Sequence, residues 1–152
     1  MLFNISLFGN IDPEKQRELY KNSLNTGDIY LKDFKEADHH KMFIIAGISS
    51  EKIFVCAIFI NSAIHPSIAN KPKIKQLQVP LLKSRNEFLK YDSFANCAFP
   101  IHLETEAITK GIVDKSCKFI GNIHSQDLGF VQNAIINSGI LTPEQIELYF
   151  KK

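Results

Sequence analysis

The chain has 152 residues, about the length of one ordinary domain, and 45% of them are hydrophobic against 22% charged. This composition is typical of a soluble globular protein, and a formal net charge of only +2 excludes a uniformly basic surface, so any affinity for nucleic acid must come from a local patch. No stretch approaches the roughly 20 apolar residues of a membrane span, and the N-terminus lacks the basic start of a signal peptide, so we expect a cytoplasmic protein.

The first predicted element is a helix from Asp12 to about Leu24. Asp12-Pro13-Glu14 supplies a capping acid, a proline at the first helical position and an acid in the first turn. From Gly27 onward the apolar residues alternate with polar ones, which predicts a strand over residues 27–34.

Two nearly continuous apolar runs follow, MFIIAGIS (42–49) and IFVCAIFINS (53–62). The polar turn between them, residues 49–52, predicts a β-hairpin whose two faces are both largely covered.

The middle of the chain is punctuated by prolines. Residues 65–75 contain two of them and predict a loop that is mobile until it meets a partner, and Pro80 makes the strand over 77–82 an edge strand or a bend. Residues 88–104 are strand-like, residues 105–110 predict a short turn or helical step, and residues 110–124 complete the β-rich part.

The end of the chain is predicted to be helical. Ser125 can cap a helix that runs through about Asn137, with Gly139 beyond its end. Thr142 and Gln145 form a capping box that opens a last short helix.

The three cysteines, Cys56, Cys97 and Cys117, are an odd number, lie among apolar residues and show no C-x-x-C spacing. We interpret them as buried reduced thiols rather than a disulfide framework or a zinc site.

The order of these segments resembles the PemK/MazF group of toxin ribonucleases. GDIYLKDF (27–34) resembles the opening strand of that family, HKMFIIAG (40–47) and VCAIFINSAI (55–64) resemble its next two strands, and FLKYDSFANC (88–97) with IHLETEAITKGI (101–112) resembles its Asp-Ser strand and the following step. The resemblance covers roughly residues 27 to 136.

This resemblance implies a mainly β fold with terminal helices, in which an SH3-like small β-barrel carries an extra N-terminal helix. We expect one domain over residues 1–152: an N-terminal extension (1–26), the barrel (27–124) and C-terminal helices (125–152).

The resemblance also implies catalytic positions. The catalytic arginine of the family falls on Lys41, and its threonine falls on Asn61, or on Ser62 with a shift of one residue. Lysine is a compact point charge rather than a bidentate fork, so the exchange changes how a phosphate would be held.

Metal-free RNA cleavage needs a base, an acid and a cation that stabilises the phosphorane. His39 or His40 can supply the proton transfers because histidine titrates near neutral pH, with Lys41 as the charge stabiliser. The alternative interpretation of Asp38-His39-His40-Lys41 is a solvated polar turn, and for Asn61 and Ser62 it is an ordinary strand end.

Other polar residues in the β-rich part have structural interpretations. Asp92 lies within an apolar strand, and we expect its carboxylate to bind loop amides rather than act in catalysis. His102 could face the cleft, but we favour a satisfied structural histidine, and His65 and His124 are assigned no role. No pair of histidines shows ligand spacing with a third ligand, so we expect neither a metal site nor a cofactor.

A basic patch lies between Lys71 and Lys90, where five lysines and Arg85 face a single acid, Glu87. Such cations gain affinity for nucleic acid by releasing its counterions, although a solvated face is the alternative. The candidate RNA-binding residues are Lys71, Lys73, Lys75, Lys83 and Arg85.

These expectations lead to two hypotheses. The first is the toxin of a toxin–antitoxin system, a homodimeric, metal-independent endoribonuclease that cleaves single-stranded RNA. We expect its cognate antitoxin to be a protein, with an RNA antitoxin as the alternative. The second is a catalytically inactive barrel of the same kind that binds nucleic acid or a protein partner.

Overall fold

The computed structural model of the chain describes residues 12–33 and 40–150. In chain order the elements are α2 (Pro13–Ser23), β1 (Asp28–Asp33), β2 (His40–Ile48), β3 (Phe54–Asn61), α3 (Pro66–Ala69), α4 (Pro72–Lys75), β4 (Gln78–Leu81), β5 (Ser93–Asn96), β6 (Ile101–Glu104), α5 (Thr105–Asp114), β7 (Cys117–Asn122), α6 (Ser125–Asn137) and α7 (Pro143–Phe150). The prediction of a β-sheet core with helices towards both ends of the chain is confirmed.

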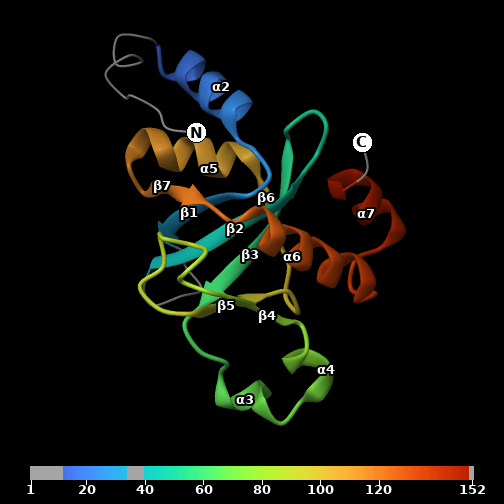
Figure 1. Cartoon of the computed structure of the whole chain (residues 1–152). Helices are drawn as coiled ribbons and strands as arrows, with labels where there is room; N and C mark the ends of the chain where they lie inside the picture. The colour runs from blue at the N-terminus through green and yellow to red at the C-terminus, as the bar shows by residue number, and fades with distance from the viewer. Residues whose placement is uncertain (1–11, 34–39, 151–152) are drawn as a thin grey trace.

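All seven strands belong to one antiparallel sheet with the order β4-β5-β3-β2-β1-β7, and β6 also pairs with β3 (Figure 1). Strands β5 and β6 follow the same edge of β3 one after the other, separated by the bend at residues 97–100. The strand pairing of the described residues therefore forms an open path from β4 to β7 rather than a ring.

The central hairpin is formed by β2 and β3, as the two apolar runs predict. In the turn, the Ser49 hydroxyl accepts hydrogen bonds from the backbone N–H groups of Ile53 and Phe54, both at 3.1 Å. Lys52 adopts a left-handed conformation with φ 57°, which closes the turn.

Both faces of this sheet are covered, which explains why the runs are continuous rather than alternating. On one face, Ile44, Ala46, Cys56 and Ile58 belong to a core completed by residues of α6 and α7. On the other face, Phe43, Ile45, Val55 and Ala57 belong to a second core completed by Leu24 and by Ile108 of α5. Figure 1 shows α5 and α2 on one side of the strands and the C-terminal helices on the other.

The capping interactions predicted for two helices are confirmed. The Asp12 carboxylate accepts from the Glu14 N–H at 2.9 Å at the start of α2. At the start of α7, the Thr142 N–H donates to the Gln145 side chain at 2.9 Å and the Gln145 N–H donates to the Thr142 hydroxyl at 3.2 Å.

The loop predicted for residues 65–75 is wrong, because the segment forms α3 and α4. Pro66 and Pro72 occupy the first positions of these helices. A backbone N–H at this position has no partner within the helix, so its absence in proline costs no hydrogen bond. The ring of His65 accepts from the Ser67 N–H at 3.1 Å and so caps α3.

Two other boundaries differ from the sequence prediction. The step predicted at 105–110 is a ten-residue helix, α5, which ends at Lys115 in a left-handed conformation with φ 70°. Helix α6 is capped by His124 rather than Ser125, because Nδ1 of His124 accepts from the Gln126 N–H at 3.1 Å. Histidine is not among the preferred capping residues, so the sequence points to its neighbour instead.

None of the helices in the described ranges is long and apolar enough to cross a membrane.

Candidate functional site

Lys41 and Asn61 meet at the end of the central hairpin, although 20 residues separate them in the chain. Met42 pairs with Ile60 in the β2–β3 register, so Lys41 and Asn61 are the next residues outward on the two strands. The Lys41 ammonium donates to Oδ1 of Asn61 at 2.8 Å and lies 5.9 Å from the centre of the Phe59 ring.

A groove of about 950 Å³ opens beside this pair. Its walls come from the ends of β2 and β3, from α3, from β4 and β5, and from the segment 88–91. The lining side chains in the described part of the chain include Lys41, Lys90, His40 and His65 but no aspartate or glutamate. Among the residues that the structure describes, no lining carboxylate neutralises the positive charge of these lysines.

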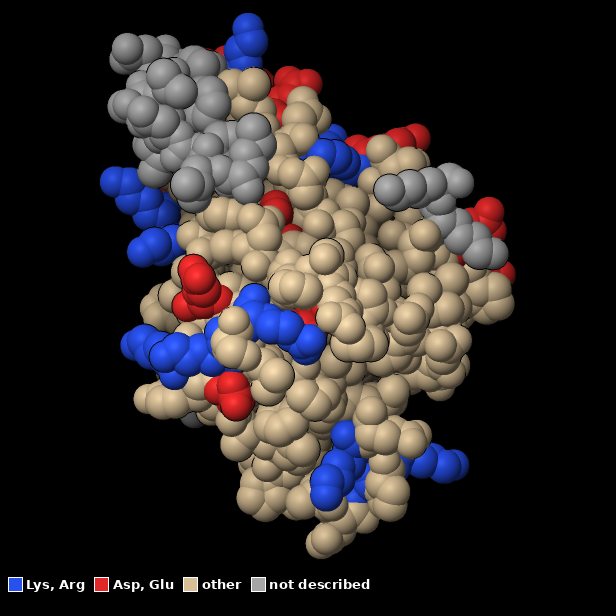
Figure 2. Space-filling view, viewed as in Figure 1, with Lys and Arg blue, Asp and Glu red and all other residues tan. Residues whose placement is uncertain are grey.

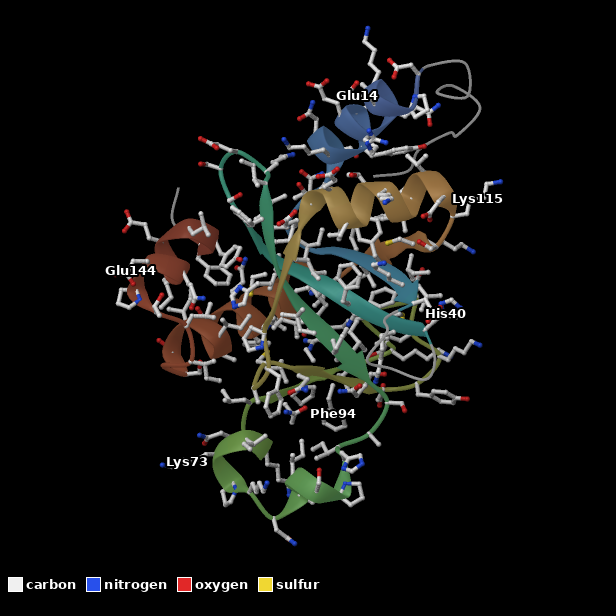
Figure 3. All side chains as sticks on the ribbon, turned by 180° about the vertical axis from the view of Figure 1, so that it is seen from behind. Glu14, His40, Lys73, Phe94, Lys115 and Glu144 are labelled. Carbon is white, nitrogen blue, oxygen red and sulfur yellow. The ribbon has the colours of Figure 1, made fainter. Side chains whose placement is uncertain are left out.

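His40 also borders the groove, but from the other side of the strand. Successive side chains of a strand point to opposite faces, so His40 and Met42 share one face and Lys41 and Phe43 share the other. His40 is exposed and pairs in register with Asp33 of β1 (Figure 3 labels it at the end of β2). The second candidate histidine, His39, and its neighbour Asp38 lie outside the described residues.

The two candidate positioning residues differ in their contacts. Asn61 is half-buried and holds the Lys41 ammonium, whereas Ser62 is exposed and borders the groove one residue further along. The geometry thus favours Asn61 as the partner of Lys41.

Three of the candidate RNA-binding lysines lie outside the groove. Lys71, Lys73 and Lys75 are exposed on α4 and at its start, and Lys73 borders a second hollow between α4 and α6. Figure 2 shows basic side chains over the α3–α4 end of the molecule, and in Figure 3 Lys73 points outward from α4.

Lys83 and Arg85 follow β4 and do not line the groove. The Asp92 carboxylate accepts from the Lys83 N–H at 2.8 Å, which confirms the predicted contact with a loop amide, but Asp92 is exposed and precedes β5 rather than lying within a strand. Arg85 forms an ion pair with the fully buried Asp127 at the start of α6.

Sequence reasoning missed several lining residues. Tyr91 and Phe99 are 67% and 53% exposed, large values for aromatic side chains. Gln78 and Asn96 also line the groove, and the Gln78 amide donates to Asn96 at 2.7 Å. In β5 the larger residues Phe94 and Asn96 alternate with the small residues Ser93 and Ala95. This alternation indicates a strand with one partly open face, and it is the signal from which these lining residues could have been predicted.

His65, for which the sequence indicates no role, also lines the groove. Its Nδ1 atom lies 2.7 Å from the Ser67 hydroxyl, in addition to capping α3. Both contacts use Nδ1 of an exposed residue, and within the described part of the chain the other nitrogen, Nε2, forms no hydrogen bond. His102, by contrast, contacts the Tyr149 hydroxyl at 3.0 Å away from the groove, which confirms its structural interpretation.

The buried titratable groups act in the fold rather than in the groove. All three cysteines are free and buried, as predicted, and desolvation raises the pKa of each thiol to about 12. Asp28 is buried, accepts from the Asn25 N–H and the Asn122 side chain at 2.9 Å each, and has its pKa raised by burial. Residues 12–33 and 40–150 contain no cluster of three histidine, cysteine or acidic side chains that could hold a metal ion.

Comparisons with protein-family models and with curated proteins find no match to this chain.

Proposed function

We propose that the chain is a metal-independent endoribonuclease of the PemK/MazF type that cleaves single-stranded RNA as the toxin of a toxin–antitoxin system. The observation that carries the proposal is the contact between Lys41 and Asn61 beside a groove that no carboxylate of the described residues lines. These are the two positions that the resemblance assigns to the catalytic arginine and threonine of the family. The proposal includes the curvature of an SH3-like barrel for the sheet, a homodimer and a cognate antitoxin, a protein rather than an RNA.

The chemistry requires the 2′-hydroxyl of one nucleotide to attack the adjacent phosphorus while the 5′-oxygen of the next nucleotide leaves. A base takes the hydroxyl proton, an acid gives a proton to the leaving oxygen, and a cyclic phosphate forms. Lys41 would stabilise the extra negative charge of the phosphorane, because a fixed cation at that point lowers the barrier. Asn61 holds the ammonium and offers its amide N–H groups to a phosphate oxygen, with Ser62 beside it.

The proton transfers fall to His39 or His40 in this proposal. Because the side chain of His40 leaves the strand on the face opposite Lys41, it would act at the rim where the groove passes around the end of β2.

That same geometry favours a second candidate function, a barrel that binds RNA or a protein partner without cleavage. An imidazole and a cation on opposite faces of one strand are poorly placed to act on a single phosphate. The replacement of the arginine fork by Lys41 points in the same direction.

Cleavage of a long mixed-sequence RNA, in the presence of a chelator, distinguishes the two. The wild-type chain is expected to produce fragments, and Lys41→Ala is expected to be about 100-fold slower or worse, because one fixed group that stabilises the transition state is removed. Lys110→Ala, which alters an exposed lysine of α5, serves as the matched control and should match the wild type.

Inducible expression in bacteria gives a second readout. Wild-type expression should arrest growth and Lys41→Ala should relieve the arrest. Equal, unimpaired growth of both cultures with confirmed soluble protein would count against a toxin, and a gel shift of RNA without fragments would support the binding function instead.

A further inference from the structure

An amide pair lies on the same face of the sheet as Lys41 and Asn61. Asn61 pairs with Phe94, and Gln78 pairs with Asn96, two residues along β5 from Phe94. Residues two apart on a strand, and residues paired across strands, point to one face. Asn61, Asn96 and Gln78 therefore follow one another across β3, β5 and β4.

The side chains of Gln78 and Asn96 are held in place by hydrogen bonds. Gln78 is only 6% exposed, and its Nε2 donates to Asn96 Oδ1 at 2.7 Å and to the Ile74 carbonyl at 3.4 Å. In the described part of the chain no other hydrogen bond of the two side chains is formed, so the Gln78 carbonyl and the Asn96 amide N–H groups remain for a ligand. Both residues line the groove.

An exposed aromatic residue, Phe99, lines the same groove as the amides. The Cys97 N–H donates to the Leu77 carbonyl at 3.0 Å, so the chain turns beside β4 and brings Phe99 to the groove wall. The Phe99 side chain is 53% exposed, so a large part of it is accessible to a ligand.

The combination matches the chemistry of a nucleobase. Each base has a π-face for an aromatic ring and an edge on which a donor stands next to an acceptor. The phosphates of the same strand would be attracted by Lys41 and Lys90, with no lining carboxylate to repel them among the described residues.

We propose that one base of a single-stranded RNA stacks on Phe99 and hydrogen-bonds to the Gln78–Asn96 pair, while a neighbouring phosphate lies at Lys41. The inference deepens the proposed function and takes its ligand class, RNA, from it, but it requires binding alone and no cleavage. An acidic peptide would also meet the lysines and could pair its backbone with the amides, but RNA supplies in addition a flat π-face for Phe99 next to its phosphates.

Binding of two hexanucleotides by fluorescence anisotropy tests this. One is a mixed-sequence 2′-O-methyl RNA, which cannot be cleaved through its blocked hydroxyl, and the other has the same charge and length but carries no bases. The wild type should bind the first about tenfold or more tightly than the second, since stacking on one aromatic ring contributes that much. Phe99→Ala and Asn96→Ala should each abolish most of this difference.

Phe130→Ala is the matched control, because Phe130 is a similarly exposed phenylalanine, 48% exposed, on α6 outside the groove. It should keep the full difference between the two hexanucleotides, and circular dichroism melting should show all three variants folded. Equal affinity of the wild type for both hexanucleotides, no binding of either, or an unchanged difference in Phe99→Ala would overturn the proposal.

The outcomes also separate this inference from the proposed activity. Base-dependent binding without cleavage of RNA supports the base site and rejects the ribonuclease. Cleavage of RNA with unchanged activity and binding in Phe99→Ala supports the ribonuclease and rejects the base site.

Discussion

Arg85 belongs to a basic patch in the sequence, but in the fold its half-buried side chain pairs with a buried carboxylate. Its guanidinium reaches Asp127, which is 42 residues away and fully buried. The Asn86 side chain donates to the second carboxylate oxygen at 2.8 Å and accepts from the His124 N–H at 2.9 Å. These contacts join the segment after β4 to the start of α6.

Asp127→Ala is therefore expected to destabilise the fold by about 2–4 kcal/mol, because it leaves a largely buried guanidinium and the Asn86 amide without their acceptor. Urea unfolding followed by circular dichroism measures the change. Asp92→Ala is the control: that carboxylate is exposed and accepts a hydrogen bond from the Lys83 N–H, so its removal should cost about 1 kcal/mol or less.

Arg85→Ala belongs to the same test and should lower stability in the same range while leaving RNA affinity unchanged at a temperature where the variant is folded. A variant with normal stability and weakened RNA binding would show instead that Arg85 acts on the ligand, as the charge pattern of the sequence suggests.

At the scale of elements, the sequence predicts correctly those segments whose residues favour a single type of secondary structure. The hairpin of β2 and β3, the caps of α2 and α7, and the edge position of Pro80 in β4 follow from apolar runs, capping residues and the missing proline N–H. The segments 65–75 and 105–114 fail because their chemistry is ambiguous: prolines both end and begin helices, and the β-branched residues of α5 favour strands.

The residues of the candidate site also differ in how well the sequence predicts them. Lys41 and Asn61 could be predicted to meet because hairpin pairing is local, and the structure places them in contact. Phe99, Gln78 and Asn96 come together only through the pairing of β4 with β5 and the bend after it, which no local pattern specifies.

Lys73 and Lys75 of α4 and Lys71 at its start lie outside the groove, and we expect them to attract RNA by long-range electrostatics. Replacing Lys71, Lys73 and Lys75 together by glutamine should weaken RNA binding and make it less dependent on salt. The slope of log affinity against log salt should fall by about 0.7 for each phosphate that the variant no longer neutralises. Titrations of the non-cleavable hexanucleotide at several salt concentrations provide the slope.

The charge-matched control replaces Lys15, Arg17 and Lys21 of α2, at the opposite end of the molecule from α4 (Figure 1). This variant should keep the wild-type slope. If both triple variants change the slope equally, the effect comes from total charge and α4 has no particular part in binding.

At the scale of the whole molecule, the sheet separates two hydrophobic cores that share their strands. Neighbouring residues of β2, such as Ile44 and Ile45, belong to different cores, so neither core can lose its packing while β2 and β3 keep theirs. The cysteines report on both: Cys56 and Cys97 lie in the core beneath α6 and α7, and Cys117 lies in the core beneath α5.

We therefore expect the three thiols to become reactive in one step. Their folded pKa of about 12 lies well above the ordinary value of 9.0, so thiolate is scarce at about pH 8 and an aromatic disulfide reagent should modify the native chain very slowly. The raised pKa also means that their contribution to stability is complete below about pH 9 and is lost as the pH rises towards 12, because the unfolded thiols ionise first.

Thiol modification across a urea titration, compared with the circular dichroism transition, measures this cooperativity. All three thiols should react over the same urea range as the loss of secondary structure. In Cys117→Ala only Cys56 and Cys97 can react. The difference from the wild type therefore gives the reaction of Cys117, the thiol of the second core. Exposure of Cys117 at clearly lower urea than Cys56 and Cys97 would show that the α5 face opens by itself, and would contradict a single cooperative unit built on shared strands.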